Sequence, residues 1–294
     1  MGDLMTAAAR NPLDSAWLDQ RWTANLSTLF TELPLVQRPA AAAEAGFDAA
    51  EIWWTLDGPT PPDSELDALR SAFTDAGVQL TGLNFDAGNM AAGSKGLLSR
   101  PADSQQFRDN IAVAVGLADS LGCKALNALY GNRVEGLDLR VQDELALENL
   151  ALAAHAVDTI GAILLVEALN APEAPEYALL SSKDAVAVVD RVNEATGLGN
   201  TYFLCDLYHL ARNGEDLQQA IAEHGARIGH VQIADAPARN QPGTGTLDFA
   251  DLLGRLDGVG YSGYIGLEYK PAAGVATVDT FGWLPRELRS SKRG

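Results

Sequence analysis

The feature that most constrains the fold of this chain is an alternation of short apolar runs with longer helical segments, which occurs eight times. The apolar runs begin near Trp22, Asp48, Gln79, Lys124, Ala162, Thr201, Ile228 and Gly263. Repeated β–α alternation predicts a parallel sheet covered by helices, and eight such units predict closure into a barrel. A doubly wound open sheet is the alternative, but no G-x-G-x-x-G motif follows the first run, which weakens it. We therefore expect an α/β fold, a single (β/α)8 TIM barrel.

The segments between these runs have the pattern of helices. They are Leu35–Gly46, Asp63–Ala76, Asp103–Leu121, Val141–Ile160, Lys183–Ala195, Gly214–His224 and Phe249–Leu256. Because we find no linker that would split the chain, we expect one barrel domain over residues 21–286, with an N-terminal extension over 1–20 and a C-terminal tail over 287–294. The long loop Asn84–Pro101 follows the third run, where loops of a barrel usually cover substrate.

The charge of the chain argues against several classes of partner. Asp and Glu number 39 against 21 Lys and Arg, which gives a formal net charge of −18 and a pI near 4.5. Phosphate binding needs clustered cations, so we expect neither nucleic acid nor an anionic membrane as a partner. A small anionic substrate would need local cations in its pocket.

The N-terminal residues and the cysteines indicate the compartment. Residues 1–20 include three aspartates and no continuous apolar core, so they do not resemble a signal peptide. No apolar run approaches the roughly 18 residues that span a bilayer. The two cysteines, Cys123 and Cys205, have no C-x-x-C spacing and fit a reducing compartment. We expect a soluble, cytoplasmic protein.

Four of the last apolar runs end on an oxygen-bearing side chain. These side chains belong to Glu167, Asp206, Gln232 and Glu268. In a parallel barrel the carboxyl ends of the strands converge on one face, so the four would share one site. Three carboxylates gathered there repel one another unless a hard divalent cation lies among them. The sequence therefore predicts a metal centre for Mg²⁺ or Mn²⁺, with Co²⁺ as a further candidate, and with it an enzyme.

Other polar residues follow these strand ends closely. His209 lies three residues after the second strand end, near enough to contact either the ligands or the substrate. Glu173 lies in the loop after the first strand end, and Arg239 brings a cation into the loop after the third. Lys270 lies two residues beyond the fourth, on the same side of the extended chain.

Two glutamates beside a divalent metal indicate proton transfer next to a carbonyl group. The metal would polarise the oxygens of a small hydroxy-carbonyl substrate and stabilise an enediolate. Of Glu167 and Glu268, one would remove a carbon-bound proton and the other would return a proton to the neighbouring carbon.

With these residues in place, the chain resembles the hydroxypyruvate isomerase family of the xylose isomerase-like TIM barrels, from about Arg21 to Arg286. The segments that carry the resemblance are Ala24–Ser27, Asn84, Ala87–Gly93, Glu167–Asn170, Asp206–His209, His230–Asp235, Pro242–Gly245 and Gly266–Pro271. The resemblance implies metal ligands at the same four strand-end residues, with the two glutamates doubling as the acid–base pair. It also implies a homo-oligomer.

The resemblance further implies interconversion of hydroxypyruvate and 2-hydroxy-3-oxopropanoate (tartronate semialdehyde). Lys270, Arg239 and Lys95 are the candidates to neutralise the substrate carboxylate, and Asn84 and Glu173 are further candidate substrate contacts. The chain departs from the pattern of many relatives at Ala168, where they carry Pro, and in its extra N-terminal residues. These departures leave the substrate open.

Three rival functions stay open from the residues. A related enzyme could act on a larger sugar or sugar acid, as a 2-oxo-tetronate isomerase or a ketose 3-epimerase does. A barrel endonuclease would need a multi-metal cluster richer in histidine than a chain with four His offers. A non-catalytic sugar-acid sensor would not need both Glu167 and Glu268, which argues against it.

Overall fold

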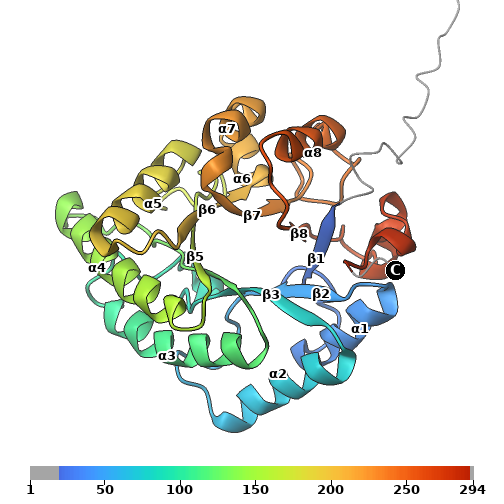
Figure 1. Cartoon of the computed structure of the whole chain (residues 1–294), viewed down its shortest axis with the longest axis horizontal. Helices are drawn as coiled ribbons and strands as arrows, with labels where there is room; N and C mark the ends of the chain where they lie inside the picture. Colours follow the sequence, from blue (N-terminus) through green and yellow to red (C-terminus); the bar gives the residue numbers. More distant parts are fainter. Residues whose placement is uncertain (1–19, 292–294) are drawn as a thin grey trace, which may run out of the picture.

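The computed structural model describes residues 20–291, and it is a closed barrel of eight parallel strands in sequential order (Figure 1). The strands are β1 (Arg21–Asn25), β2 (Ala49–Ile52), β3 (Gln79–Asn84), β4 (Ala125–Asn127), β5 (Ile163–Glu167), β6 (Thr201–Asp206), β7 (Ile228–Ile233) and β8 (Tyr264–Leu267). β1 pairs with β8 in parallel, which closes the ring. The predicted barrel is confirmed. The N-terminal extension, apart from Gln20, and the last three residues of the tail lie outside the described residues.

Helices surround the strands on the outside of the barrel (Figure 1). They are α1 (Arg38–Ala45), α2 (Asp63–Ala76), α3 (Ser104–Ser120), α4 (Leu139–Asp158), α5 (Ser182–Thr196), α6 (Leu207–Arg212), α7 (Leu217–His224) and α8 (Phe249–Gly258). Helix α6 was not predicted from the sequence, because it begins directly after a strand with no intervening loop. Among residues 20–291 no helix combines the length and the apolarity that crossing a bilayer requires.

The alternation of side chains along each strand separates the core into two parts. Leu164, Val166 and Phe203 face outward and pack in the large core between strands and helices. Leu165 and Leu204 face inward, where they form a small apolar cluster with Ala125. Because side chains two residues apart share a face, the residues that end β5 and β6 lie directly above this inner cluster. The apolar cluster therefore forms the floor beneath the barrel mouth.

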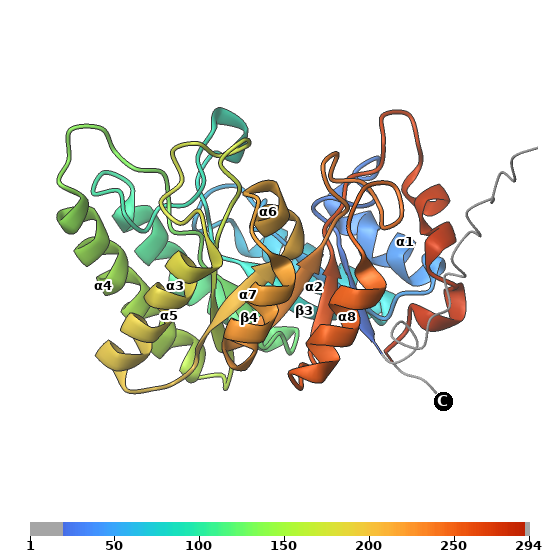
Figure 2. The same cartoon turned by 90° about the horizontal axis from the view of Figure 1, so that it is seen from above.

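The loops that follow the strands rise together on one side of the barrel (Figure 2). The C-terminal segment of the chain packs against the first strand. Trp283 lies edge-to-face on Trp22, with ring centroids 5.7 Å apart. The Thr277 hydroxyl accepts a 2.7 Å hydrogen bond from the Phe30 amide, and Ser291 bonds the Asp48 carboxylate. These contacts fasten the C-terminal segment beside the first two strands.

Candidate metal centre and substrate cavity

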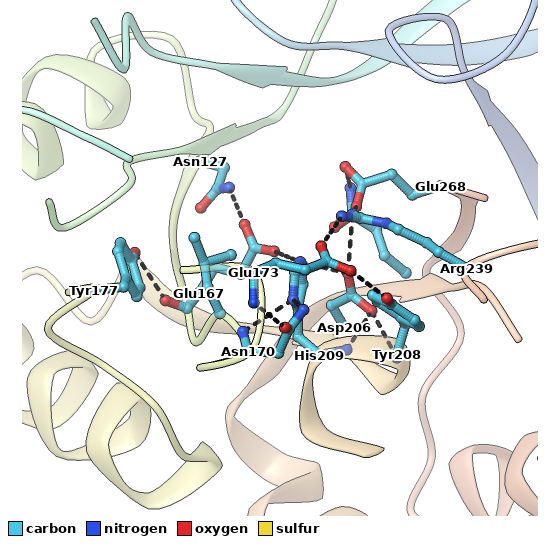
Figure 3. Close-up of polar contacts among 12 residues, drawn as sticks. Asn127, Glu167, Asn170, Glu173, Tyr177, Asp206, Tyr208, His209, Arg239 and Glu268 are labelled. Atoms are coloured by element: carbon cyan, nitrogen blue, oxygen red, sulfur yellow. Dashed lines mark hydrogen bonds and ion pairs between the residues drawn. The ribbon is translucent and has the colours of Figure 1, made fainter. Parts of the chain in front are cut away.

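Three acids and one histidine meet at the barrel mouth. Glu167, Asp206, His209 and Glu268 each offer one ligand atom, and these atoms all lie within 4.8 Å of one another. All four residues are buried. Three of the four predicted ligands thus converge, and His209 joins them. We call these four residues the carboxylate cluster (Figure 3).

Asp206 has two functions in the local structure. One of its oxygens, Oδ1, accepts from the backbone amides of Tyr208 at 2.8 Å and His209 at 3.3 Å, and so caps the start of α6. This cap turns the chain from strand into helix within one residue. The other oxygen, Oδ2, lies 3.5 Å from Nε2 of His209. The same turn therefore presents both side chains to the site.

The hydrogen bonds of His209 determine which of its nitrogens carries a proton. Its Nδ1 accepts from the backbone amide of Asn170 at 3.1 Å, and an amide N–H is always a donor. In the neutral ring the hydrogen therefore resides on Nε2. Burial, followed by the charges of Arg239, Lys95 and Lys270, lowers the pKa of His209 well below its usual value, so the ring is neutral. His209 is thus a hydrogen-bond donor toward the cavity, which suits a substrate contact better than a metal ligand.

Negative charge exceeds positive charge in the carboxylate cluster. Burial raises the pKa of Glu167 well above its usual value, and the nearby charges of Glu268 and Asp206 raise it further. Burial and Glu268 likewise raise the pKa of Asp206. The buried guanidinium of Arg239 provides one positive charge against these three acids. The excess is the condition that a divalent cation relieves.

Arg239 links the carboxylate cluster to Glu173 in the loop after β5. Its Nη2 donates to Glu268 at 2.6 Å and lies 3.9 Å from Asp206, while its Nη1 donates to Glu173 at 3.3 Å. Burial opposes the charge of Arg239, but Glu268 and Asp206 outweigh it and raise its pKa. The guanidinium also lies over the Tyr208 ring, 5.0 Å from the centroid. The tyrosine hydroxyl in turn donates to Glu173.

Gln232 lies beside this cluster with its amide oriented by neighbouring acids. It pairs in register with Asp206 across β6 and β7. Its Nε2 donates to Glu51 at 2.7 Å, and its Oε1 is buried without a hydrogen-bond partner among residues 20–291. A buried acceptor left unpaired costs about 1–3 kcal/mol. The unpartnered oxygen, together with the three carboxylates, is a donor set that fits Mg²⁺ or Mn²⁺.

A cavity of about 300 Å³ opens above the carboxylate cluster. Every predicted substrate contact lines it, namely Asn84, Lys95, Glu173, His209, Arg239 and Lys270. Burial and the nearby Arg239 lower the pKa of Lys270. The volume of the cavity is at the lower end of the range for ligand cavities, which suits a small substrate.

The structure adds four residues that the sequence analysis did not assign to the site. Asn127 donates to Oε2 of Glu167 at 2.8 Å. Oε1 of Glu268 accepts from Trp53 at 2.8 Å and from Asn25 at 3.1 Å. Glu51 binds the amide of Gln232. Asn25 and Asn127 also end strands on an oxygen-bearing side chain, so the rule applied to the later strands would have found these two.

Comparison with known proteins gives consistent relatives. The family model described as xylose isomerase-like TIM barrel matches residues 39–287. A Streptomyces coelicolor protein named "Putative hydroxypyruvate isomerase" is 62% identical and covers 93% of this chain and 99% of its own. Hydroxypyruvate isomerase of Escherichia coli is 32% identical, with coverage of 85% and 93%. A 2-oxo-tetronate isomerase of Pectobacterium atrosepticum is also 32% identical, with coverage of 90% and 96%.

Solved structures agree on the fold. A crystal structure from Brucella melitensis, described as an AP endonuclease of family 2, superposes with a TM-score of 0.80 at 34% identity, covering 90% of this chain and 97% of its own. A D-psicose 3-epimerase from Clostridium cellulolyticum H10 superposes with a TM-score of 0.69 at 19% identity, with 91% of each chain covered. The second likeness concerns the fold alone.

Proposed function

This chain belongs to the hydroxypyruvate isomerase family of xylose isomerase-like TIM barrels and is an isomerase, and we propose that it interconverts hydroxypyruvate and 2-hydroxy-3-oxopropanoate with a divalent metal. The observation that carries the proposal is the convergence of three buried acids within 4.8 Å at the mouth of a small cavity, which is lined by basic side chains. The acids supply charge for a metal, and the cations supply charge for a substrate carboxylate.

The proposed metal ligands are Glu167, Asp206 and Glu268, with Oε1 of Gln232 as the fourth donor. A bound Mg²⁺ or Mn²⁺ would polarise the oxygens of the substrate and neutralise the excess charge of the acids. Asn127 holds one oxygen of Glu167, and Trp53 holds one oxygen of Glu268, so each carboxylate is oriented by a donor from another strand or loop.

The two glutamates are proposed to move the protons. Conversion of hydroxypyruvate removes a proton from C3 and adds one to C2, while the hydroxyl proton passes from the C3 oxygen to the C2 oxygen. Glu268, ion-paired with Arg239, suits proton removal, and Glu167, whose pKa burial raises, suits proton return. Because the reaction is reversible, each glutamate is the base in one direction and the acid in the other. The Nε2–H of His209 is placed to donate to a substrate oxygen.

We assign the substrate carboxylate to Lys95 and Lys270. Arg239 already pairs with Glu268 and Glu173, so its charge is largely used within the protein. Both lysines line the same cavity, and the charges of both contribute to the low pKa of His209. Their ammonium groups can therefore offset the repulsion that a strongly acidic protein exerts on an anionic substrate.

A 2-oxo-tetronate isomerase is the second candidate function. Relatives with that name match this chain as closely as the Escherichia coli hydroxypyruvate isomerase does, at 32% identity. The catalytic groups would be the same, and the difference would lie in how much of the cavity the substrate fills. Values of kcat/KM for the three-carbon and four-carbon substrates separate the two.

The proposal is tested with the purified protein, Mn²⁺ and hydroxypyruvate in D₂O. Deuterium at C2 of the product, followed by NMR, is the expected result, and it requires proton transfer through an acid that exchanges with solvent. Replacement of the exposed Glu148 by Gln is the matched control and should leave the rate unchanged. Absence of turnover on every small keto acid with Mg²⁺, Mn²⁺ or Co²⁺ present would contradict the proposal and favour the sensor.

A further inference from the structure

A second polar group lies inside the barrel, next to the carboxylate cluster. At its centre is the buried carboxylate of Glu51. Oε2 of Glu51 lies 2.6 Å from Nε2 of His230, and Oε1 accepts from Asn25 at 3.0 Å and from Gln232 at 2.7 Å. We call these four residues the Glu51 network. His230 precedes Gln232 by two residues in β7, so it shares the inward face and lies one layer deeper.

The barrel makes room for Glu51 with glycines on two other strands. A Cβ at Gly266 of β8 would lie 2.5 Å from Oε1 of Glu51, and a Cβ at Gly82 of β3 would lie 3.1 Å from its Cβ. Glycine inside a strand costs about 0.5–1 kcal/mol relative to alanine and often marks a close approach. The position of this carboxylate is therefore tightly defined by its surroundings.

The Glu51 network and the carboxylate cluster share two amide groups. The NH₂ group of Gln232 donates to Glu51 at 2.7 Å and to Glu268 at 3.4 Å. The NH₂ group of Asn25 donates to the same two acids, at 3.0 Å and 3.1 Å. Both amides therefore present their nitrogen, and not their oxygen, to these two acids.

The two amides differ in whether the oxygen has a hydrogen-bond partner of its own. The oxygen of Asn25 has its own partner, the backbone amide of Ser27 at 2.9 Å. The oxygen of Gln232 is buried and has none among the described residues, so nothing on that side fixes the amide. The short bond to Glu51 is thus what determines which end of the Gln232 amide is free to face a cation.

We propose that Glu51 is a positioning residue of the metal site, which holds the amide of Gln232 so that its oxygen is presented to the divalent cation. The inference rests on the proposed function, because it requires that a metal binds at the carboxylate cluster. Glu51 itself does not contact the metal. It acts through Gln232 and, by way of Asn25, steadies Glu268 as well.

The competing explanation is that Glu51 only satisfies His230 and stabilises the barrel. Thermal stability alone cannot separate the two, because loss of a buried carboxylate lowers it in either case. The dissociation constant of Mn²⁺, measured on the full-length protein by the EPR signal of free Mn²⁺, does separate them. A purely structural Glu51 would leave this constant unchanged in a folded variant.

Three variants of Glu51 should weaken Mn²⁺ binding to different extents. Glu51→Leu removes every acceptor and should weaken Mn²⁺ binding about 10–100-fold. Glu51→Asp keeps the carboxyl group but withdraws it by one methylene, and an intermediate loss is expected. Glu51→Gln keeps one oxygen for the two amides, so it should restore affinity close to that of the wild type.

The matched control is Thr81→Val. Thr81 is buried inside the same barrel, 2.6 Å from the hydroxyl of Thr23, and it donates to the carbonyl of Ala50. Loss of the Thr81 hydroxyl should lower the melting temperature and leave the dissociation constant of Mn²⁺ unchanged. If Glu51→Leu does not fold, the comparison of Glu51→Asp with Glu51→Gln carries the test.

The outcomes are distinct. Weaker Mn²⁺ binding in the Leu and Asp variants, with recovery in Gln, supports the positioning role. Wild-type affinity in every folded Glu51 variant, or an equal loss in Thr81→Val, overturns it while the proposed function stands. Failure of the wild-type protein to bind Mn²⁺ overturns the proposed function and the positioning role together.

Discussion

The carboxylate cluster and the Glu51 network are neighbours in one barrel, and they differ in how many carboxylates they bring together. In the Glu51 network a single carboxylate accepts hydrogen bonds from Asn25 and Gln232 and lies next to Nε2 of His230, so both of its oxygens have partners. In the carboxylate cluster three acids lie within 4.8 Å of one another, and burial together with neighbouring acids raises the pKa of Glu167 and Asp206. The lone carboxylate is satisfied by protein donors, whereas the three acids leave a negative charge that a cation would offset.

This difference shows why a buried acid is not informative until the charges around it are counted. Glu51 and Glu167 are both buried glutamates on inward faces of the barrel. Burial and neighbouring acids raise the pKa of Glu167, which records how poorly its negative charge is compensated by the protein. Uncompensated charge in a cavity, rather than burial alone, indicates where chemistry takes place.

The largest expected effect contrasts the two glutamates in catalysis. Glu167→Gln removes a proton-transfer group and should lower kcat about 10²–10⁴-fold. Glu51→Gln keeps an acceptor for the amides of Gln232 and Asn25, so kcat should change far less. Steady-state kinetics at saturating Mn²⁺ measure both. Equal losses in the two variants would remove the distinction between the groups.

The next largest effect is on the free energy of unfolding of the metal-free protein, which two variants should change in opposite directions. Burial, followed by the charges of Glu268 and Asp206, raises the pKa of Glu167, so this acid costs folding free energy above the usual pKa of a carboxyl group. Glu167→Gln removes that cost, and the free energy of unfolding should rise. Glu51→Leu leaves buried donors unpaired, which should lower the free energy of unfolding by about 1–3 kcal/mol. Urea unfolding in the presence of EDTA compares them. A destabilised Glu167→Gln protein would mean that this glutamate is structural.

The smallest effect is the pH dependence of metal binding. Burial and like charges raise the pKa of Glu167 and Asp206, so both hold protons above the usual range for carboxyl groups. Mn²⁺ must displace these protons, and its affinity should therefore rise as the pH increases above the usual pKa range of carboxyl groups. Titrations of Mn²⁺ at several pH values test this. A pH-independent constant would indicate that the acids are already ionised without metal.

The barrel was predictable because its signals are local. Each strand begins within one residue of the position expected from its apolar run, and α2 spans Asp63–Ala76 as predicted. The strand ends Glu167 and Asp206 followed from the rule that parallel strands converge. The short helix α6 was not predicted, because Asp206 ends a strand and caps a helix at the same time.

The Glu51 network was not predictable from the same signals. Ala50 pairs with Leu80 and Glu51 pairs with Gly82, so the pairing skips Thr81 and brings a glycine opposite the glutamate. Such a register shift arises from packing across the barrel and leaves no mark in the periodicity of one strand. The orientation of the Gln232 amide depends on this packing as well.

The proposed metal site can be examined in a crystal grown with Mn²⁺, by anomalous scattering. We expect one strong peak bound by carboxylate oxygens of Glu167, Asp206 and Glu268 and by Oε1 of Gln232, at about 2.0–2.3 Å. His209 should remain outside the coordination sphere, with its Nδ1 still bonded to Asn170. A peak that excludes Gln232 and includes Nε2 of His209, or no peak at the barrel mouth, would contradict the account.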